Sequence, residues 1–538
     1  MVQRPTDQEK SDFKRVMARQ EAMELERSGF EANWDDCYKY IMPRRGRVTS
    51  TDQPGNIRGD ELFDSTATLA NQRLSGALHS MLTNQATRFF ELAFGIPDLD
   101  DDEEVKSWLQ KVTDLMHDTM NNSNFQTEIH ELYQDLGGIG TSCMFIGEHA
   151  ERIVHFMTRA MKEIFVQENN LGLIDVVHRK FKWNLRQIVQ EFGEACLTPD
   201  LLKLYNEGNS EQREILHVVE PSLKKGYFAF DSKYFLVSSS ITLSGDKGFK
   251  EFPYVVPRWT KNSGESYGRG PGMDALPDVK MANAMKETTL QGGQLAVGPP
   301  IMVDDDNVLG SVQMTPFGIT VVRKIDTNPI RPINANSRVD FGQKLIENTQ
   351  HTIDDHFFVN QMQLGDTPQM TATEVNQRTQ EMLKFMGPVL GRQHFEFLKP
   401  TVERVYAIME RKGLIPPPPP KAAKKRFEVK YSSLIARAQK MGDGSNLSQA
   451  FSVASPIANA IPSALDIIDG DKALRYIFDI YGVPQKIMNS EKTIKETRDA
   501  RAKAQQKAAQ EAQEQHAADL VQKAGPSVVQ AQQGPNQQ

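Results

Sequence analysis

The sequence is poor in cysteine and has no long apolar run. Its 538 residues include only Cys37, Cys143 and Cys196, which are far apart and show no Cys-x-x-Cys spacing. Such a pattern encodes neither a disulfide framework nor a structural zinc site. The first ten residues lack the apolar segment of a signal peptide, and no stretch approaches the roughly 18 consecutive apolar residues of a membrane span. We therefore expect a reduced protein that is neither secreted nor inserted in a membrane.

The sequence also has no excess of basic over acidic residues. The chain has 63 lysines and arginines against 70 aspartates and glutamates, a net charge of −7. A protein that grips nucleic acid through a broad cationic surface is therefore disfavoured. Apolar residues make up 39% of the chain, and the 36 glycines bring the total to about 46%, as in ordinary globular proteins, while the length exceeds the roughly 150 residues of one domain. We expect several folded regions.

Motifs for catalysis and metal binding are also lacking. The glycine-rich segment 267–272 is followed by no Gly-Lys-Ser/Thr, and Pro271 removes a backbone donor, so a backbone hinge is favoured over a phosphate loop. His351 and His356 are five residues apart and fall on different helix faces. The acidic run 98–104 suits the first turn of a helix better than a metal site. The sequence thus offers no catalytic, cofactor-binding or metal-binding residues.

Hydrophobic spacing predicts long helices around a mixed α/β region. A helix is expected over residues 7–42, with Trp34, Tyr38 and Ile41 on one face, and short strands are expected between residues 143 and 259. A helix over 270–297 and a small β-rich insertion come next. In the helix that follows, four apolar residues form a narrow seam that we expect neighbouring helices and copies to bury: Val339, Ile346, Ile353 and Phe357.

The C-terminal half has a different composition. Residues 360–370 form a loop with one charge, Asp366, and residues 371–374 form a capping box that opens a long helix, kinked at Gly387-Pro388. Five prolines, 416–420, predict a stiff spacer, with a ligand for proline-binding modules as the alternative. Helices are expected again over about 446–501, and the Ala/Gln-rich end is either disordered or a marginal helix.

Several segments, taken in order, resemble one protein family. They are Trp34 with Tyr38-Lys-Tyr-Ile-Met-Pro43, Asp64-Ser-Thr66, Gly268-Arg-Gly-Pro-Gly-Met-Asp-Ala-Leu276, Pro299-Pro300, Met370-Thr-Ala-Thr-Glu-Val375 with Arg378 and Glu381, and Ala436-Arg-Ala-Gln-Lys440. Up to about residue 500 the chain resembles the portal, or head-to-tail connector, proteins of short-tailed bacteriophages.

The resemblance implies an α+β, mainly helical fold that assembles as a ring of about twelve copies around a central channel. The implied regions are a wing (1–269), a first stem helix (270–297), a clip (298–335), a second stem helix (336–359), a tunnel loop (360–370), a wing spine helix with the polyproline spacer (371–440), crown helices (441–500) and a tail that is disordered or an extended helix (501–538). The resemblance implies that the four seam residues pack the stem helices.

The resemblance also implies a function and partners. The ring would sit at the capsid vertex of the virion, pass double-stranded DNA during packaging and ejection without binding it tightly, and assemble in the host bacterial cytoplasm. Its partners would be the terminase large subunit, a tail adaptor, and the major capsid and scaffolding proteins. An ATPase or nuclease of the packaging machinery and a scaffold protein that forms no ring are the alternatives. We expect no enzyme, no cofactor and no membrane insertion.

Two sets of residues are implied as functional. The tunnel-loop residues that would face the channel are Gln361, Met362, Gln363, Leu364, Gln369 and Met370. The clip residues that would dock partners and pair between adjacent subunits are Asp304, Asp305, Asp306, Arg323, Lys324 and Arg331.

Overall fold

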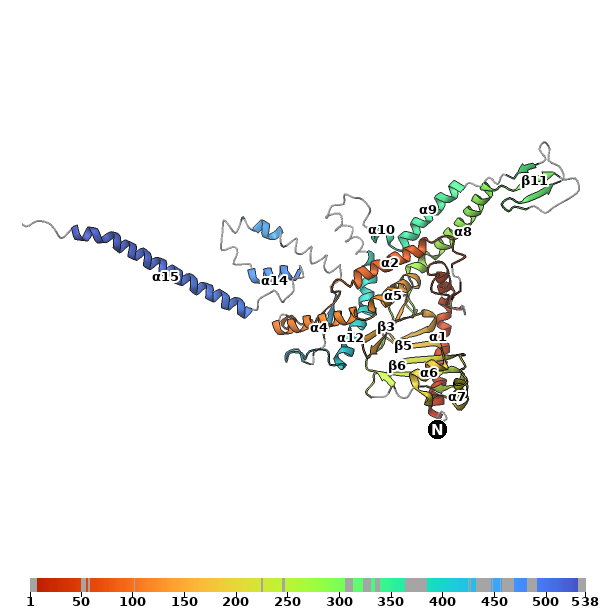
Figure 1. Ribbon diagram of the computed structural model, residues 1–538, viewed down its shortest axis with the longest axis horizontal. Helices are drawn as coiled ribbons and strands as arrows, with labels where there is room; N and C mark the ends of the chain where they lie inside the picture. The colour runs from red at the N-terminus through yellow and green to blue at the C-terminus, as the bar shows by residue number, and fades with distance from the viewer. Residues whose placement is uncertain are drawn as a thin grey trace, which may run out of the picture. The chain divides into compact units, whose positions relative to one another are not determined.

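The computed structural model of the chain contains helices and small sheets (Figure 1), which confirms the α+β, mainly helical class. It describes residues 7–49, 55–56, 59–100, 102–223, 226–243, 247–304, 313–322, 330–333, 339–362, 385–423, 425, 427–431, 447, 449–454, 456, 469–480 and 491–530. The chain divides into two compact units, Met1–Ile96 with Trp108–Ala438, and Pro97–Ser107 with Gln439–Gln538.

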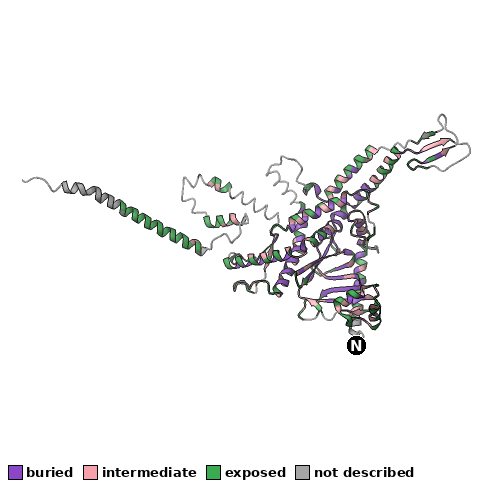
Figure 2. Ribbon diagram, viewed as in Figure 1, coloured by how far each residue is buried: buried purple, intermediate pink, exposed green. Residues whose placement is uncertain are grey.

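A six-stranded antiparallel sheet forms one end of the first unit. Its members are β4 (Ile164–Glu168), β5 (Ile174–Asn184), β6 (Gln212–Pro221), β7 (Phe230–Leu236) and β8 (Ile241–Thr242), with β9 (Lys247–Phe249) paired to β7. Because side chains alternate along a strand, Leu216 and Val218 on β6 face one side and Ile215 faces the other. The first side packs on α1 (Asp7–Tyr40), and the second packs on α6 (Leu185–Phe192) and α7 (Pro199–Asn206). Both faces of the sheet are therefore covered (Figure 2).

The second half of α1 is buried through its aromatic stripe. Trp34 is completely buried and meets the ring of Tyr267 edge to face, with 5.1 Å between the ring centroids. Tyr38 and Ile41 are buried on the same face. The stripe predicted from the spacing of these residues is confirmed, and it packs against the segment that leads into α8.

A layer of helices and a three-stranded sheet complete the body of this unit. The helices are α2 (Thr66–Leu82), α4 (Glu103–Asn121), which begins in the second unit, and α5 (Phe125–Ile139). The sheet has the order β10 (Tyr254–Val255), β2 (Cys143–His149) and β3 (Ile153–Arg159). The remaining short elements are β1 (Glu91–Ala93), α3 (Pro97–Asp100), η1 (Met161–Glu163), η2 (Glu194–Cys196) and η3 (Val237–Ser239).

A joint of glycines connects α5 to the start of α8 (Pro271–Val297). Gly140 caps α5 in the left-handed region (φ +76°), and a Cβ placed on Gly270 would lie 2.6 Å from the Gly140 amide nitrogen. A Cβ on Gly268 would lie 2.5 Å from the Gly140 carbonyl oxygen. The two backbones meet without room for side chains, so these glycines serve close packing, a role different from the hinge expected from sequence.

A helical hairpin with a small sheet at its tip follows. The chain runs out along α8 and returns along α9 (Val339–His356), which pairs with it (Figure 1). At the tip, β11 (Ile301–Asp304) lies between β12 (Ile319–Val322), which is parallel to it, and β13 (Ile330–Pro332), which is antiparallel. Pro271 opens α8, where its missing amide donor costs no helical hydrogen bond, whereas Pro277 lies inside the helix and removes one. The expected helix and β-rich insertion are both present.

The chain then returns to the body of the unit. After the four-residue α10 (Val359–Met362), residues 363–384 lie outside the described residues, including the capping box at 371–374. Residues 385–393 are helical, the π-helical turn η4 covers His394–Leu398, and α12 covers Lys399–Arg411. Gly413 follows with φ +69°, as expected for a glycine just beyond a helix end.

The prolines and the C-terminal segments complete the chain. The carbonyl of Pro416 accepts a hydrogen bond from the Trp108 indole (2.9 Å), and β14 (Glu428–Lys430) pairs with β1. In the second unit, α14 (Gly470–Ile480) and α15 (Glu491–Gln530) are helical, so the boundary expected at residue 500 falls inside one helix.

We predict that Gly270→Ala destabilises the fold strongly. The added methyl group would overlap the backbone of Gly140, and a clash with backbone is relieved only by separating α5 from α8, at about 3 kcal/mol or more. Denaturant unfolding followed by circular dichroism measures the change. Gly76→Ala in α2 is the matched control, because nothing lies within 4 Å of its Cβ position, and it should stabilise by about 0.5–1 kcal/mol. Equal stability of Gly270→Ala and wild type would contradict the close packing.

A buried carboxyl group lies beside this joint. Asp135 on α5 is fully buried, and its Oδ1 is 3.1 Å from Nε of Arg45. Burial raises the pKa of Asp135 to about 7, although the Arg45 charge opposes the rise. In the unfolded chain the same group has a pKa near 3.9. Folding therefore favours its protonated form.

This pKa predicts a pH dependence of stability. The contribution of the Asp135 carboxyl group to the free energy of unfolding is fully present below about pH 4 and is lost as the pH rises through about 7. The reason is that ionising the buried group costs about 1.4 kcal/mol per unit of difference between its folded and unfolded pKa. The stability of the wild type should therefore fall relative to that of Asp135→Asn between these pH values. Unfolding curves of both proteins at pH 4.5, 6 and 7.5 measure the difference, and a constant difference would contradict the raised pKa.

Candidate channel and docking surfaces

The base of the α8–α9 hairpin is fixed by the loop before α2. The side-chain oxygen of Asn283 on α8 accepts hydrogen bonds from the amides of Phe63 (2.8 Å) and Asp64 (3.1 Å), and its amino group donates to the carbonyl of Glu61 (3.2 Å). The buried amide of Asn283 is thus paired through both of its ends, which sets the position of α8 along this loop.

Asp64 links both helices of the hairpin. Its carboxylate is buried, lies 3.2 Å from Nζ of Lys286 on α8 and accepts a hydrogen bond from Gln350 on α9 (2.9 Å). Thr66 donates a third hydrogen bond (3.0 Å). The sequence marked this Asp-Ser-Thr segment only as part of a resemblance, and the structure adds a physical role, because one buried anion holds the two helices together.

The apolar seam of α9 is largely buried within the single chain. Ile346, Ile353 and Phe357 are buried, and Val339 at the start of the helix is half-buried. They are covered in a region where α9 packs on α8 and α2. The expected packing of this seam on a neighbouring helix is present, and the chain's own helices cover most of it without a second copy. Any role of the four residues in packing between subunits stays a prediction.

The outer half of the hairpin exposes large apolar side chains instead. Leu290 and Val297 on α8 are 53% and 85% exposed, and Phe341 and Leu345 on α9 are 61% and 41% exposed. No residue of α8 after Asn283 is buried. Sequence reasoning missed these residues because it looked for a single seven-residue repeat, whereas Phe341 and Leu345 lie one turn apart on another face of the helix.

A groove of about 990 Å³ lies between the outer halves of α8 and α9. Leu290, Gly293 and Val297 line it from α8, Ile346 lines it from α9, and Phe317 of the insertion lines its outer end. Phe317 is 76% exposed and has a positive φ of 59°, a backbone conformation that is strained for an aromatic residue. The hairpin therefore presents an open apolar groove below a constrained aromatic ring.

The structure describes only part of the expected clip residues. Asp304 ends β11, where it is in register with Val322, and Arg331 in β13 is in register with Met302. Asp305, Asp306, Arg323 and Lys324 lie outside the described residues. Besides Phe317, three apolar side chains among the described residues of the insertion are exposed, namely Met314, Ile319 and Ile330. Partner docking by this insertion therefore stays a prediction.

The expected tunnel loop begins at a fixed point. Gln361 and Met362 are the last residues of α10, which packs against α2 and α9, and Gln361 is exposed. Gln363, Leu364, Gln369 and Met370 lie outside the described residues.

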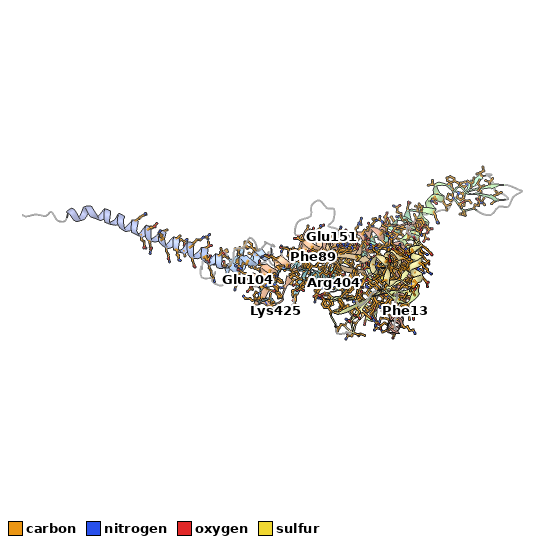
Figure 3. The ribbon with its side chains drawn as sticks, turned by 60° about the horizontal axis from the view of Figure 1, so that its bottom comes forward. Phe13, Phe89, Glu104, Glu151, Arg404 and Lys425 are labelled. Atoms are coloured by element: carbon orange, nitrogen blue, oxygen red, sulfur yellow. The ribbon has the colours of Figure 1, made fainter. Side chains whose placement is uncertain are left out.

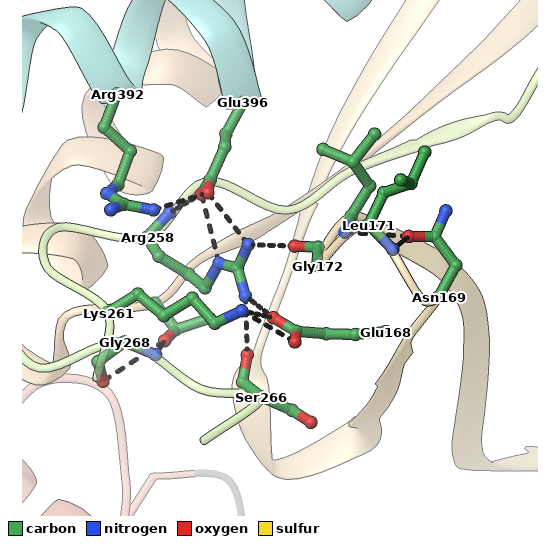
Figure 4. A network of polar contacts seen from close by, with 12 residues as sticks. Glu168, Asn169, Leu171, Gly172, Arg258, Lys261, Ser266, Gly268, Arg392 and Glu396 are labelled. Atoms are coloured by element: carbon green, nitrogen blue, oxygen red, sulfur yellow. Dashed lines mark hydrogen bonds and ion pairs between the residues drawn. The ribbon is translucent and has the colours of Figure 1, made fainter. Parts of the chain in front are cut away.

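The helix that follows the loop is tied to the body of the unit through Arg258 (Figure 4). The Arg258 guanidinium is almost completely buried, contacts Glu168 on β4, and donates to Glu396 in η4 through Nε (3.1 Å) and Nη2 (2.8 Å). Further donations go to the carbonyls of Gly172 and Ser266. Burial opposes the charge, but hydrogen bonds and charge interactions with the two glutamates outweigh it and raise the arginine pKa. The network fixes the π-helical turn.

A second set of ion pairs holds α12. Arg404, labelled in Figure 3, lies 2.5 Å from Glu251. Arg411 lies two turns further along the same face of α12, 2.8 Å from the same carboxylate. Arg411 also pairs with Glu148 at the end of β2 (2.6 Å). The segment after the expected loop is therefore fixed at both η4 and α12.

The hairpin itself is acidic. Together α8 and α9 contain seven acidic side chains and three lysines. Asp340, Glu347 and Asp355 of α9 are exposed. Such a surface repels a polyanion and gives it no tight binding site.

The part of the chain that the structure describes has no group of three or more His, Cys, Asp or Glu side chains arranged to hold a metal ion. Nor does any of its described helices combine the length and apolar character needed to cross a membrane. His356 lies 3.3 Å from Asp278 of α8 and His351 lines a separate pocket, so the two histidines do not share a site.

Comparisons with known proteins agree with this arrangement. Residues 14–488 match a family described as bacteriophage head to tail connecting protein. The portal protein of Salmonella phage epsilon15 is 29% identical over 516 residues, which cover 93% of this chain and 92% of that protein. The probable portal protein of Bordetella phage BPP-1 is 27% identical over 532 residues, 96% of each chain.

These matches extend over almost the whole chain, and the resemblance inferred from the ordered motifs is confirmed. A structural role at the head-to-tail junction is supported, and the alternative of a packaging enzyme is not favoured. The match to the family model covers far more than half of the sequence, and the chain therefore belongs to the family of bacteriophage head to tail connecting proteins.

Proposed function

We propose that about twelve copies of this chain form a closed ring at the portal vertex of a phage capsid, and that double-stranded DNA enters and leaves the capsid through its channel. In this assembly α8 and α9 form the stem, the β11–β13 insertion forms the clip, residues 1–269 form the wing and the helices around 441–500 form the crown. The support is family membership together with the architecture of the hairpin.

The hairpin is the observation that carries this proposal. Its base is fixed by Asp64 and Asn283, while its outer half leaves Leu290, Phe341 and Leu345 exposed. Burying a side chain of this size is worth about 1.5–3 kcal/mol, and a monomer in water forgoes that stabilisation. Side-by-side packing of hairpins in a ring would recover it, because each copy would cover its neighbour.

The charge of the hairpin suits a channel for DNA. Each copy contributes an excess of four negative charges from α8 and α9, so a ring of copies would present an acidic stem. Repulsion keeps a duplex near the axis and prevents the phosphate contacts that make DNA binding tight. The net charge of −7 acts in the same direction.

Residues 360–370 are proposed as the tunnel loop that faces the channel. The loop leaves α10, which is packed on α2, and the chain re-enters a helix that Arg258 and Glu396 fix to β4. The described segments on either side of residues 363–384 are thus fixed to the body of the unit. Its glutamine and methionine side chains offer exchangeable hydrogen bonds and adaptable apolar contacts, which suit a moving DNA strand.

Different partners are proposed to bind at the two ends of such a ring. The clip would bind the terminase large subunit during packaging and the tail adaptor afterwards, while the wing and crown would face the major capsid and scaffolding proteins. The ring would be a component of the virion, assembled in the bacterial cytoplasm, and the energy for packaging would come from the terminase.

The ring is tested by native mass spectrometry of the purified chain. Twelve copies of 60.6 kDa should give a closed species of about 727 kDa. Its abundance should fall in high concentrations of denaturant before the helical signal is lost. Only monomers and dimers over a wide range of protein and salt concentrations would contradict the proposal.

Docking by the clip is tested by replacing residues 301–332 with a short Gly-Ser linker. The hairpin base is held by Asp64 and Asn283, both outside this segment, so the variant should still form rings. Pull-down assays should then show loss of binding to the terminase large subunit and to the tail adaptor. Unchanged binding of both partners to a correctly assembled variant ring would place docking elsewhere.

A further inference from the structure

Helix α9 presents different surfaces on its two flanks. With 3.6 residues per turn, Phe341 and Leu345 lie on one flank, and Gln343, Glu347 and Gln350 lie on the opposite flank, where they line the groove. The buried face that carries Ile346 and Ile353 separates the two flanks. The hairpin therefore has projecting apolar side chains on one side and an apolar groove on the other.

The two surfaces lie at the same level of the hairpin. Gly342 contacts α8 closely, since a Cβ at this position would lie 2.9 Å from Oγ1 of Thr289. Thr289 itself lines the groove together with Leu290 and Gly293. Phe341 and Leu345 thus stand beside the part of α8 that carries the groove, on the far side of the hairpin.

The groove has room for these side chains. Its volume of about 990 Å³ is at the upper end of the range of typical ligand pockets. Nothing lies within 4 Å of a Cβ placed on Gly293, so the α8 wall is open at this point. Leu290, Val297 and Ile346 supply apolar surface, and Lys286 and Glu347 lie at its polar edge.

The inference drawn from these observations rests on the ring proposed above and specifies the contact between its adjacent copies. Rotation about a ring axis moves a copy sideways without changing its level, so each flank of a hairpin meets the opposite flank of the next copy. We propose that Phe341 and Leu345 of one copy insert into the groove between α8 and α9 of the adjacent copy. The occupant of the groove is thus a second copy of this chain, and the contact is heterologous.

Phe317 has a specific place in this contact. Its ring packs on Gly298, where a Cβ would lie 2.7 Å from the ring, and its strained backbone holds it at the outer end of the groove. An inserted Phe341 would remove the exposed face of this ring from water. The strain is therefore used to position an aromatic contact for the neighbouring copy.

Disulfide trapping between two variants that each carry one introduced cysteine tests the contact. Leu345→Cys and Leu290→Cys are each made in a Cys196→Ser background, since Cys196 is only half-buried whereas Cys37 and Cys143 are buried. The two chains carry different tags and are co-assembled, and mild oxidation should give a disulfide-linked pair that contains one chain of each kind. Each variant assembled alone should give no linked pair.

The possible results separate this contact from the ring itself. Rings that form normally but give no mixed pair would overturn the proposed contact and leave the ring intact. Failure of the wild-type chain to form rings would contradict the proposed function, and the contact would fall with it. If the cysteine variants alone fail to assemble, that failure supports the flanks as an interface, because both substituted side chains are exposed in the single chain.

A second pair of variants checks the contact without any disulfide. Phe341→Ser with Leu345→Ser should lower the fraction of chain in rings at least tenfold at equal protein concentration and leave the monomer's melting temperature unchanged. The control is Leu25→Ser with Leu171→Ser, which replaces two apolar residues outside the hairpin that are even more exposed, at 77% and 76%, and it should assemble as wild type does. Wild-type ring yield from the hairpin variant would overturn the proposal.

Discussion

The contact between two glycine-bearing backbones fixes the direction in which the hairpin leaves the body of the protein. Gly140 ends α5, and Gly268 and Gly270 pass so close to it that no side chain fits between them. The start of α8 is therefore determined by backbone contact, which does not repack as side chains do. Because α9 and the insertion follow α8 along the chain, their position relative to the rest of the first unit depends on this joint.

The base of the α8–α9 hairpin is fixed by buried hydrogen bonds, whereas its outer half is exposed. Near the base, Asp64 and Asn283 use buried hydrogen bonds to hold α8 and α9 together. Farther out the same helices bury little, and their apolar side chains lie open on both flanks. A rigid base with an incomplete outer half suits a subunit that becomes complete only beside other copies.

Local signals predicted several elements correctly. The stripe of Trp34, Tyr38 and Ile41, the helix that begins at Pro271 and the β-rich insertion were all visible in residue spacing and in glycine or proline boundaries. Helices α6 and α7 were missed, although Asn184 and Gln187 form a capping box that marks the start of α6. That signal was present in the sequence and was overlooked.

Other features depend on contacts between distant segments. The role of Asp64 requires knowing that Lys286 and Gln350 lie beside it, more than 200 residues away in sequence. The burial of Ile346 and Ile353 inside the chain depends on α2 and α8, and the seven-residue repeat alone does not identify these two helices. The flanking positions of Phe341 and Leu345 likewise gain meaning only once the groove on the opposite side is known.

Electron cryo-microscopy of the purified assembly tests the central claim most directly, because it shows both the symmetry and the element that lines the axis. The account predicts a closed ring in which α8 and α9 of every copy surround the channel, with β11–β13 at one end. A ring whose channel is lined by the six-stranded sheet, with the α8–α9 hairpins projecting from the outer rim, would contradict it.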